Sequence, residues 1–219
     1  LPARESCAAG AGAALREEVE RVTCPVVLID RLTQCGWCDA VGFDNYLGGR
    51  LAAQYLLEGG HKRIGIVTGD VAESSAADRR RGFVDAIERA GERLDPSLCV
   101  AGDYRFASGY RAADRIIDGG ATAVFCCNDV MALGFRQRMA ERGLHVTEDM
   151  QVIGYDNILK RFGLGWRMTT VEQSVGDLAA ACWGMLGGRI DGVVNGAGAG
   201  ADAGRPWLAA PEGKVLAPE

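Results

Sequence analysis

Several apolar runs in the sequence end in polar side chains of the kinds that bind small polar molecules. The clearest example is Asn128-Asp129, which follows apolar residues 123–127 and precedes apolar residues spaced along one helix face. The other polar ends are Asp30-Arg31, Asp44-Asn45, Thr68 with Asp70, Asp103-Tyr104 and Asp156-Asn157. Carboxylates and amides supply hydrogen-bond acceptors and donors for the hydroxyl groups or ring edges of such a molecule.

Charged and aromatic residues close to these polar ends extend that chemistry. Arg79 lies in the helix expected after Gly69, and a guanidinium group can donate two parallel hydrogen bonds. Aromatic rings that could stack on the face of a flat ligand are Tyr104, Phe106, Phe162 and Trp166. Together these residue types suit a sugar or a nucleobase.

The polar ends can act together only if the elements before them form a common sheet. Apolar runs predict strands at residues 26–30, 40–43, 64–67, 98–101, 123–127 and 152–155. The apolar residues of the tail, Trp207-Leu208 and Val215-Leu216, are enough for a short strand at most. Helical spacing predicts helices at 11–22, 47–58, 76–90, 107–118, from 129 onward, and at 175–187. This alternation is typical of an α/β fold with parallel sheets flanked by helices. Such sheets bind ligands at the carboxyl ends of their strands.

Each polar end also has a purely structural interpretation. Asp and Asn side chains after a strand often cap the next helix or form a local turn. The ligand hypothesis therefore depends on the whole set, because capping does not explain the aromatic residues beside it.

The sequence gives little support for catalysis, and we expect neither a metal nor a cofactor. Its two histidines, His61 and His145, lie in expected surface turns, and no nucleophile elbow, phosphate loop or zinc-protease motif occurs. A hydrolase that uses two of the aspartates stays open. Cys35-Gly36-Trp37-Cys38 could be a redox dithiol or half of a zinc site, but two thiols in a loop are the simpler interpretation.

Composition and charge exclude some classes of protein. A formal net charge of −5 argues against a nucleic-acid-binding surface on this chain, which would normally be basic. No apolar run approaches the roughly 20 residues that span a bilayer. Residues 1–10 lack the charged and apolar regions of a signal peptide. We therefore expect a cytoplasmic protein without membrane contact.

Seven segments, in order and spacing, resemble the effector-binding region of lac-repressor-type (LacI/GalR) transcription regulators. They are PVVLIDR (25–31), DAVGFDNYLGGRLAAQYLLEGGHKRIGIVTG (39–69), RRRGF (79–83), GDYRFASGYRAADRII (102–117), AVFCCNDVMALG (123–134), GLHVTEDMQVIGYDN (143–157) and MTTVEQ (168–173). The resemblance covers about residues 25–190.

The resemblance implies a two-lobed, type I periplasmic-binding-protein-like fold with an effector in the cleft between the lobes. Residues 1–60 and 165–190 would form the N-terminal lobe, residues 61–164 the C-terminal lobe, and residues 191–219 a Gly/Ala-rich joint and tail. The family pattern has a helix-turn-helix, a hinge helix and two β-α units ahead of the point where this sequence starts. The N-terminal lobe is therefore expected to be incomplete, and the helix-turn-helix to be absent from this chain.

The resemblance also implies a set of effector contacts. They fall on Ser75, Arg79, Tyr104, Asn128 and Asp156, with Asp30 as a further candidate. In the roles expected, Arg79 donates, Asp156 accepts, Asn128 does both, and Tyr104 stacks against the ligand.

These expectations favour one function over two others. The first is the effector-binding and dimerisation domain of a bacterial transcriptional repressor that senses a sugar or purine-like ligand. It would act as a homodimer and contact DNA only through the N-terminal helix-turn-helix. The alternative is a periplasmic sugar-binding protein of a transporter, and a third class is an α/β enzyme that acts on a sugar. We expect no enzymatic activity.

Overall fold

The chain folds into two compact units of different size. A computed structural model describes residues 14–30, 37–158, 168–194 and 213–216. The larger unit is Asp44–Gln173, and the smaller combines Leu1–Phe43 with Ser174–Leu216. These boundaries differ from the expected lobes, which assigned residues 44–60 and 165–173 to the N-terminal lobe and residues 191–219 to a separate joint and tail.

The larger unit is built on a five-stranded parallel sheet with the strand order β4-β3-β5-β6-β7. Its strands are β3 (Ile64–Thr68), β4 (Cys99–Ala101), β5 (Ala123–Cys126), β6 (Gln151–Asp156) and β7 (Thr169–Glu172). Every residue of β3 and β5 is buried, as expected for apolar strands covered on both faces. The predicted parallel α/β architecture is therefore confirmed.

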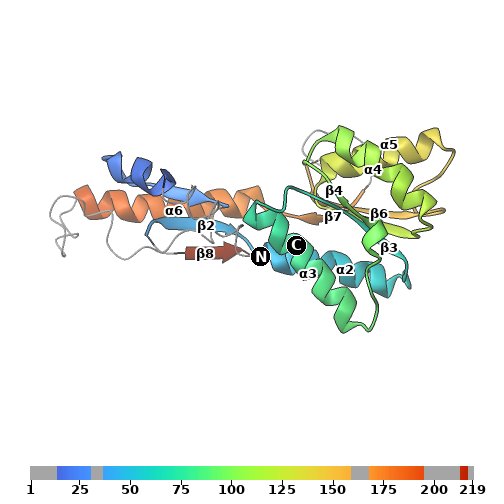
Figure 1. Ribbon diagram of the computed structural model, residues 1–219. Helices are drawn as coiled ribbons and strands as arrows, with labels where there is room; N and C mark the ends of the chain where they lie inside the picture. The colour runs from blue at the N-terminus through green and yellow to red at the C-terminus, as the bar shows by residue number, and fades with distance from the viewer. Residues whose placement is uncertain (1–13, 31–36, 159–167, 195–212, 217–219) are drawn as a thin grey trace. The chain divides into compact units, whose positions relative to one another are not determined.

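Two helix pairs cover the faces of this sheet (Figure 1). They consist of α2 (Asn45–Glu58) with α3 (Ser74–Arg89), and of α4 (Phe106–Asp118) with α5 (Asp129–Glu141); a short 3-10 turn, η2 (Pro96–Leu98), precedes β4. Glycines let α2 and α3 touch: a Cβ at Gly49 would lie 2.0 Å from the Arg79 carbonyl oxygen, and one at Gly82 1.9 Å from that of Tyr46. This close packing explains why α2 belongs to the larger unit.

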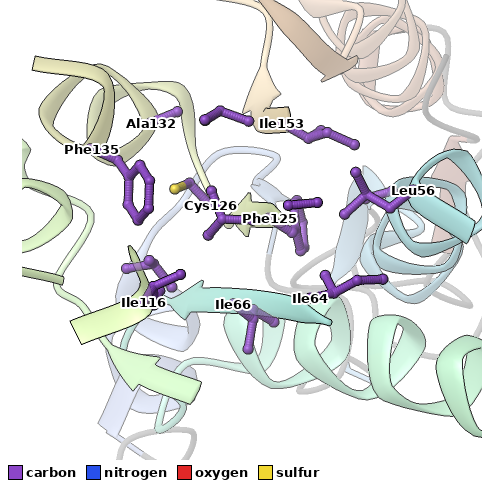
Figure 2. Packing of buried hydrophobic residues seen from close by; sticks show 14 of the residues in the cluster. Leu56, Ile64, Ile66, Ile116, Phe125, Cys126, Ala132, Phe135 and Ile153 are labelled. Atoms are coloured by element: carbon purple, nitrogen blue, oxygen red, sulfur yellow. The ribbon is translucent and has the colours of Figure 1, made fainter. Parts of the chain in front are cut away.

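Aliphatic and aromatic side chains from both sheet faces form one continuous core. Figure 2 shows Ile64, Ile66 and Phe125 of the central strands between Leu56 on one side and Phe135 on the other. The stripe predicted for the helix after Asn128 is confirmed, because Met131, Phe135 and Met139 are all fully buried. This core fixes the strand ends that carry the candidate site.

The smaller unit contains a parallel sheet of its own. Its strands are β1 (Val27–Ile29), β2 (Asp39–Phe43) and β8 (Gly213–Leu216), in the order β1-β2-β8. Helix α6 (Val175–Val194) packs against all three strands, and residues 14–21 are also helical. The Ser174 hydroxyl accepts a hydrogen bond from Asp177 N at 3.3 Å and so caps α6.

Some sequence expectations fall outside the described residues. These are the CxxC partner Cys35, the aromatic residues Phe162 and Trp166, and the Gly/Ala-rich residues 195–204. Cys38 is described: its thiol is buried and donates to the Val26 carbonyl at 3.4 Å. None of the helices described in the structure is long and apolar enough to cross a membrane.

Candidate ligand-binding site

Five of the six predicted site residues lie in the larger unit, on the strand ends and the helix starts that follow them. Ser75 and Arg79 belong to α3, and Tyr104 follows β4. Asn128 follows β5, and Asp156 is the last residue of β6. The sixth, Asp30, follows β1 of the smaller unit. The five residues are linked through the contacts of Arg79, Tyr104 and Asn128.

Arg79 is the centre of this group and its side chain is only 6% exposed. Its Nε donates to Asn45 Oδ1 at 2.8 Å, and its Nη1 donates to the Cys127 carbonyl at 2.6 Å. The guanidinium carbon lies 3.7 Å from the centre of the Tyr155 ring, a cation–π contact. Its Nη2 lies 3.6 Å from Asp156 Oδ1, an ion pair longer than a normal hydrogen bond.

The surroundings keep this buried guanidinium charged. Burial by itself lowers the pKa of Arg79, but Tyr155 and Asp156 raise it, and the net direction is upward. A permanent cation at a sheet edge is a fixed donor for an acceptor group on a ligand.

Asp156 ends β6 in an unusual backbone conformation. Its φ angle is +99°, and that of the next residue, Asn157, is +53°. Positive φ angles are rare for residues with a side chain and often mark binding sites. The Asp156 side chain is 28% exposed, so its carboxylate is accessible while it remains close to Arg79.

Asn128 holds two elements of the site together. Its Oδ1 accepts from Met131 N at 2.9 Å, which caps α5, and its Nδ2 donates to the Tyr104 carbonyl at 3.0 Å. The structural interpretation of a strand-end amide therefore accounts for these two bonds. The second bond also fixes the backbone of Tyr104, which belongs to the predicted site.

Tyr104 is held in a left-handed conformation with a φ angle of +63°. Its hydroxyl is buried and has no hydrogen-bond partner that meets normal geometry among the described residues. Burial raises the pKa of Tyr104 to about 12, although the Arg79 charge and the nearby Ser75 hydroxyl act in the opposite direction. A buried hydroxyl without such a partner suits a polar group of a ligand, so Tyr104 offers more than an aromatic face.

Other strand-end carboxylates act only in local turns. Asp44 Oδ1 accepts from Leu47 N at 2.8 Å and caps α2, and Asp70 Oδ1 accepts from Ala72 N at 2.9 Å. Asp103 Oδ1 accepts from Arg105 N at 3.1 Å. For these three residues the capping and turn interpretation is confirmed.

Sequence reasoning missed two direct partners of Arg79. Asn45 was recognised as a strand-end residue, but nothing in the sequence indicated that α2 packs on α3 and brings its amide to the guanidinium. Tyr155 lies inside an apolar run, and its contact with Arg79 has no sequence signal. Both side chains orient the guanidinium, which is the group suited to a ligand.

The arrangement supports binding better than chemistry. It offers a guanidinium, a carboxylate and a phenol within one edge of a sheet, a set that recognises hydroxyl groups or the edge of a base. Among the described residues, no group of three His, Cys, Asp or Glu side chains could hold a metal ion.

Comparison with known proteins identifies the family of this chain. The family described as "Periplasmic binding protein-like domain" matches residues 53–200. The chain belongs to this family, in its LacI-type regulator group. The fold and the family expected from the sequence are thus confirmed.

Named relatives of this LacI-type domain are repressors. The HTH-type transcriptional repressor PurR of Pasteurella multocida is 38% identical over 169 residues, which are 76% of this chain and 51% of PurR. PurR of Escherichia coli O1:K1 is 35% identical over 185 residues, 83% of this chain and 53% of PurR. This chain therefore spans about half the length of the curated relatives it matches.

The fold of this LacI-type domain is also similar to that of a solved structure. A LacI family transcriptional regulator from Enterococcus faecium with bound ribose superimposes with a TM-score of 0.74 and is 27% identical. The match covers 89% of this chain and 68% of that one.

Proposed function

We propose that this chain is the effector-binding domain of a bacterial transcriptional repressor and that it senses a sugar or a purine-like molecule. The observation that carries the proposal is the buried Arg79, held by Asn45, Tyr155 and Asp156 at the carboxyl edge of the sheet. Such a fixed donor beside an acceptor is what a polar ring requires. Ser75, Tyr104, Asn128 and Asp30 complete the proposed site, with Asn128 acting mainly through Tyr104.

The proposal includes the partners expected of a repressor. The full protein would contact DNA through an N-terminal helix-turn-helix, would act as a homodimer in the cytoplasm, and would catalyse no reaction. The repressor relatives support this reading and do not favour the transporter alternative. In the coding sequence upstream of Leu1, a basic helix-turn-helix would support the proposal, and an export signal would contradict it.

A ligand screen with a matched pair of variants tests the site. Calorimetry with ribose, other neutral sugars and purine bases should find a ligand for the unaltered chain. Arg79→Met should then weaken binding by roughly 100-fold, because two lost charge-assisted hydrogen bonds cost about 3 kcal/mol. The control is Arg80→Met, which removes the exposed arginine next in sequence and should leave binding unchanged. Equal affinities for the two variants would remove Arg79 from the site.

Sedimentation of the chain with and without the ligand tests the assembly. A homodimer at micromolar concentration would agree with the proposal, and a monomer at every accessible concentration would contradict its dimer component. The calorimetric result does not depend on this outcome.

A further inference from the structure

The turn after β6 has a backbone that needs external support. Two consecutive residues, Asp156 and Asn157, have φ angles of +99° and +53°. Side-chain-bearing residues keep such angles only where surrounding contacts fix them. Strand β6 pairs with β5 as far as Ile153 and with β7 as far as Asp156, so sheet pairing alone does not hold Asn157 or Ile158.

Asp129 provides the first of these contacts from inside the protein. The residue is fully buried, its Oδ2 accepts from Ile158 N at 2.7 Å, and its Oδ1 accepts from the Thr170 hydroxyl at 2.7 Å. Gly154 leaves the space for this carboxylate, because a Cβ there would lie 2.2 Å from Asp129 Oδ1. Asp129 thus ties the start of α5 to the turn and to β7.

Strand β7 provides the second and third contacts. The Thr170 hydroxyl that donates to Asp129 also accepts from Asn157 N at 3.4 Å. Glu172 Oε2 accepts from Asn157 Nδ2 at 2.7 Å. Three of these bonds hold Asn157 or Ile158, the two residues that follow Asp156. The fourth joins Thr170 to Asp129.

We infer that Asp129, Thr170 and Glu172 are positioning residues for ligand binding, here named the turn clamp. The clamp fixes the turn after β6 so that the Asp156 carboxylate lies beside Arg79, 3.6 Å from its Nη2. The inference rests on the proposed function, since it assumes that Asp156 and Arg79 contact the ligand. The clamp residues themselves act through the backbone of the turn.

One strand of the structure supplies a closely matched set of variants. Thr170→Val keeps the shape of the side chain and removes the hydroxyl that makes two clamp bonds. Thr169→Val makes the same change one residue earlier, where the hydroxyl accepts from Gln151 Nε2 at 3.4 Å and has no other hydrogen bond with the described residues. Thr170→Ser retains the hydroxyl and should rescue the clamp.

The first measurement needs no ligand. In NMR spectra of the full chain, the Ile158 amide reports the clamp, and the Arg79 Nε–H reports the guanidinium that lies beside Asp156. Thr170→Val should shift both resonances, whereas Thr169→Val and Thr170→Ser should leave both near their original positions. If Thr170→Val shifts them no more than Thr169→Val does, the inference is wrong.

The second measurement is calorimetry with D-ribose and with hypoxanthine as probes. Thr170→Val should weaken the binding of whichever probe binds by about tenfold, the effect of losing one hydrogen bond to a charged group. Binding of neither probe to the unaltered chain would count against the proposed function, while the NMR result would still decide the clamp.

A second clamp variant covers the case in which Thr170→Val does not fold. Glu172→Gln weakens the charge-assisted bond to Asn157 and should shift the same Arg79 resonance, with an affinity loss of about threefold. Its control is Glu148→Gln on the exposed surface. Equal spectra for these two variants would overturn the inference.

Discussion

Each compact unit contains a largely buried arginine, and the two are bound in different ways. In the smaller unit, Arg189 donates from Nε and Nη2 to both carboxylate oxygens of Asp39, each at 2.7 Å. In the larger unit, Arg79 donates to neutral oxygens of Asn45 and Cys127, and its nearest carboxylate oxygen is 3.6 Å away. The first arginine is paired with a carboxylate through two parallel hydrogen bonds, and the second is held by neutral oxygens with a carboxylate at a longer distance.

This difference in partners distinguishes an arginine that stabilises the fold from one that is suited to bind a ligand. Arg189 of α6 and Asp39 of β2 come from the two chain segments that make up the smaller unit, so their pair joins those segments. Arg79 is oriented by its own unit, with the Tyr155 ring against the guanidinium and an accessible carboxylate beside it. Burial alone therefore does not indicate which role an arginine has; the geometry of its partners does.

The largest effect is expected from Arg189→Met. This variant removes the Arg189 guanidinium from the buried Asp39 carboxylate, and breaking such a pair typically costs about 3–5 kcal/mol of unfolding free energy. Urea unfolding and hydrogen exchange at the β2 amides measure the loss. The double variant Asp39→Leu with Arg189→Met should recover most of it, because an apolar pair needs no desolvated charge. Without that recovery, the loss would reflect packing rather than charge.

Arg79→Met should destabilise the protein less. It leaves the oxygens of Asn45 and Cys127 without their donor, at a cost of about 2 kcal/mol, while Asp156 can still be hydrated. Hydrogen exchange should place the loss in β5 and α3 of the larger unit. The Arg80→Met control should leave the same amides unchanged. A loss as large as that of Arg189→Met would mean that Arg79 is equally structural.

Much of the larger unit was predictable because its periodicity is strong. The run 123–127 and the stripe Met131, Phe135 and Met139 appear in the structure as β5 and the buried face of α5. The boundary between the two units was harder to predict from the sequence, because it depends on how closely α2 approaches α3. That distance is set by Gly49 and Gly82, which look like ordinary helical glycines in the sequence.

The candidate site was predictable as a set of residue types but not as a set of contacts. Strand-end chemistry and the family resemblance selected Arg79, Tyr104 and Asp156, which lie close together. The same reasoning could not separate the capping residue Asp44 from its neighbour Asn45, which binds Arg79. Hydrogen-bond partners distant in sequence depend on tertiary packing, and local patterns do not contain that information.

Alkaline pH offers a way to perturb the larger unit selectively. All five tyrosines lie between residues 46 and 155, and burial raises the pKa of Tyr104 to about 12. The folded state therefore holds this proton more tightly than the unfolded chain, and the stability it contributes is lost as pH rises from about 10 to about 12. At a pH in this window, unfolding of Tyr104→Phe should release about one proton fewer than unfolding of the unaltered chain.

The control for the alkaline experiment is Tyr55→Phe, since the Tyr55 side chain is half exposed. Urea titrations at pH 10, 11 and 12 give the slopes of stability against pH. The prediction fails if the two variants have the same slope, because buried Tyr104 would then behave like an exposed tyrosine.

The smallest effect is expected from a third arginine, which also contacts both oxygens of one carboxylate but through a single nitrogen and without the burial of Arg189. Arg138 Nε donates to both Asp114 oxygens at 3.0 Å, but the two side chains are 31% and 43% exposed. Water and salt screen such pairs, so Arg138→Ala should leave the melting temperature within experimental error.

A local readout shows whether the Arg138 contact exists in solution. The hydrogen bond from Arg138 lowers the pKa of Asp114, so NMR titration of Asp114 should show that pKa rising in Arg138→Ala. A shifted pKa without a shifted melting temperature would mean that the Arg138–Asp114 contact forms and contributes little to stability. If Arg138→Ala instead cost as much stability as Arg189→Met, burial would not be what sets the contribution of an arginine–carboxylate pair. The contrast between Arg189 and Arg79 would then need a different cause.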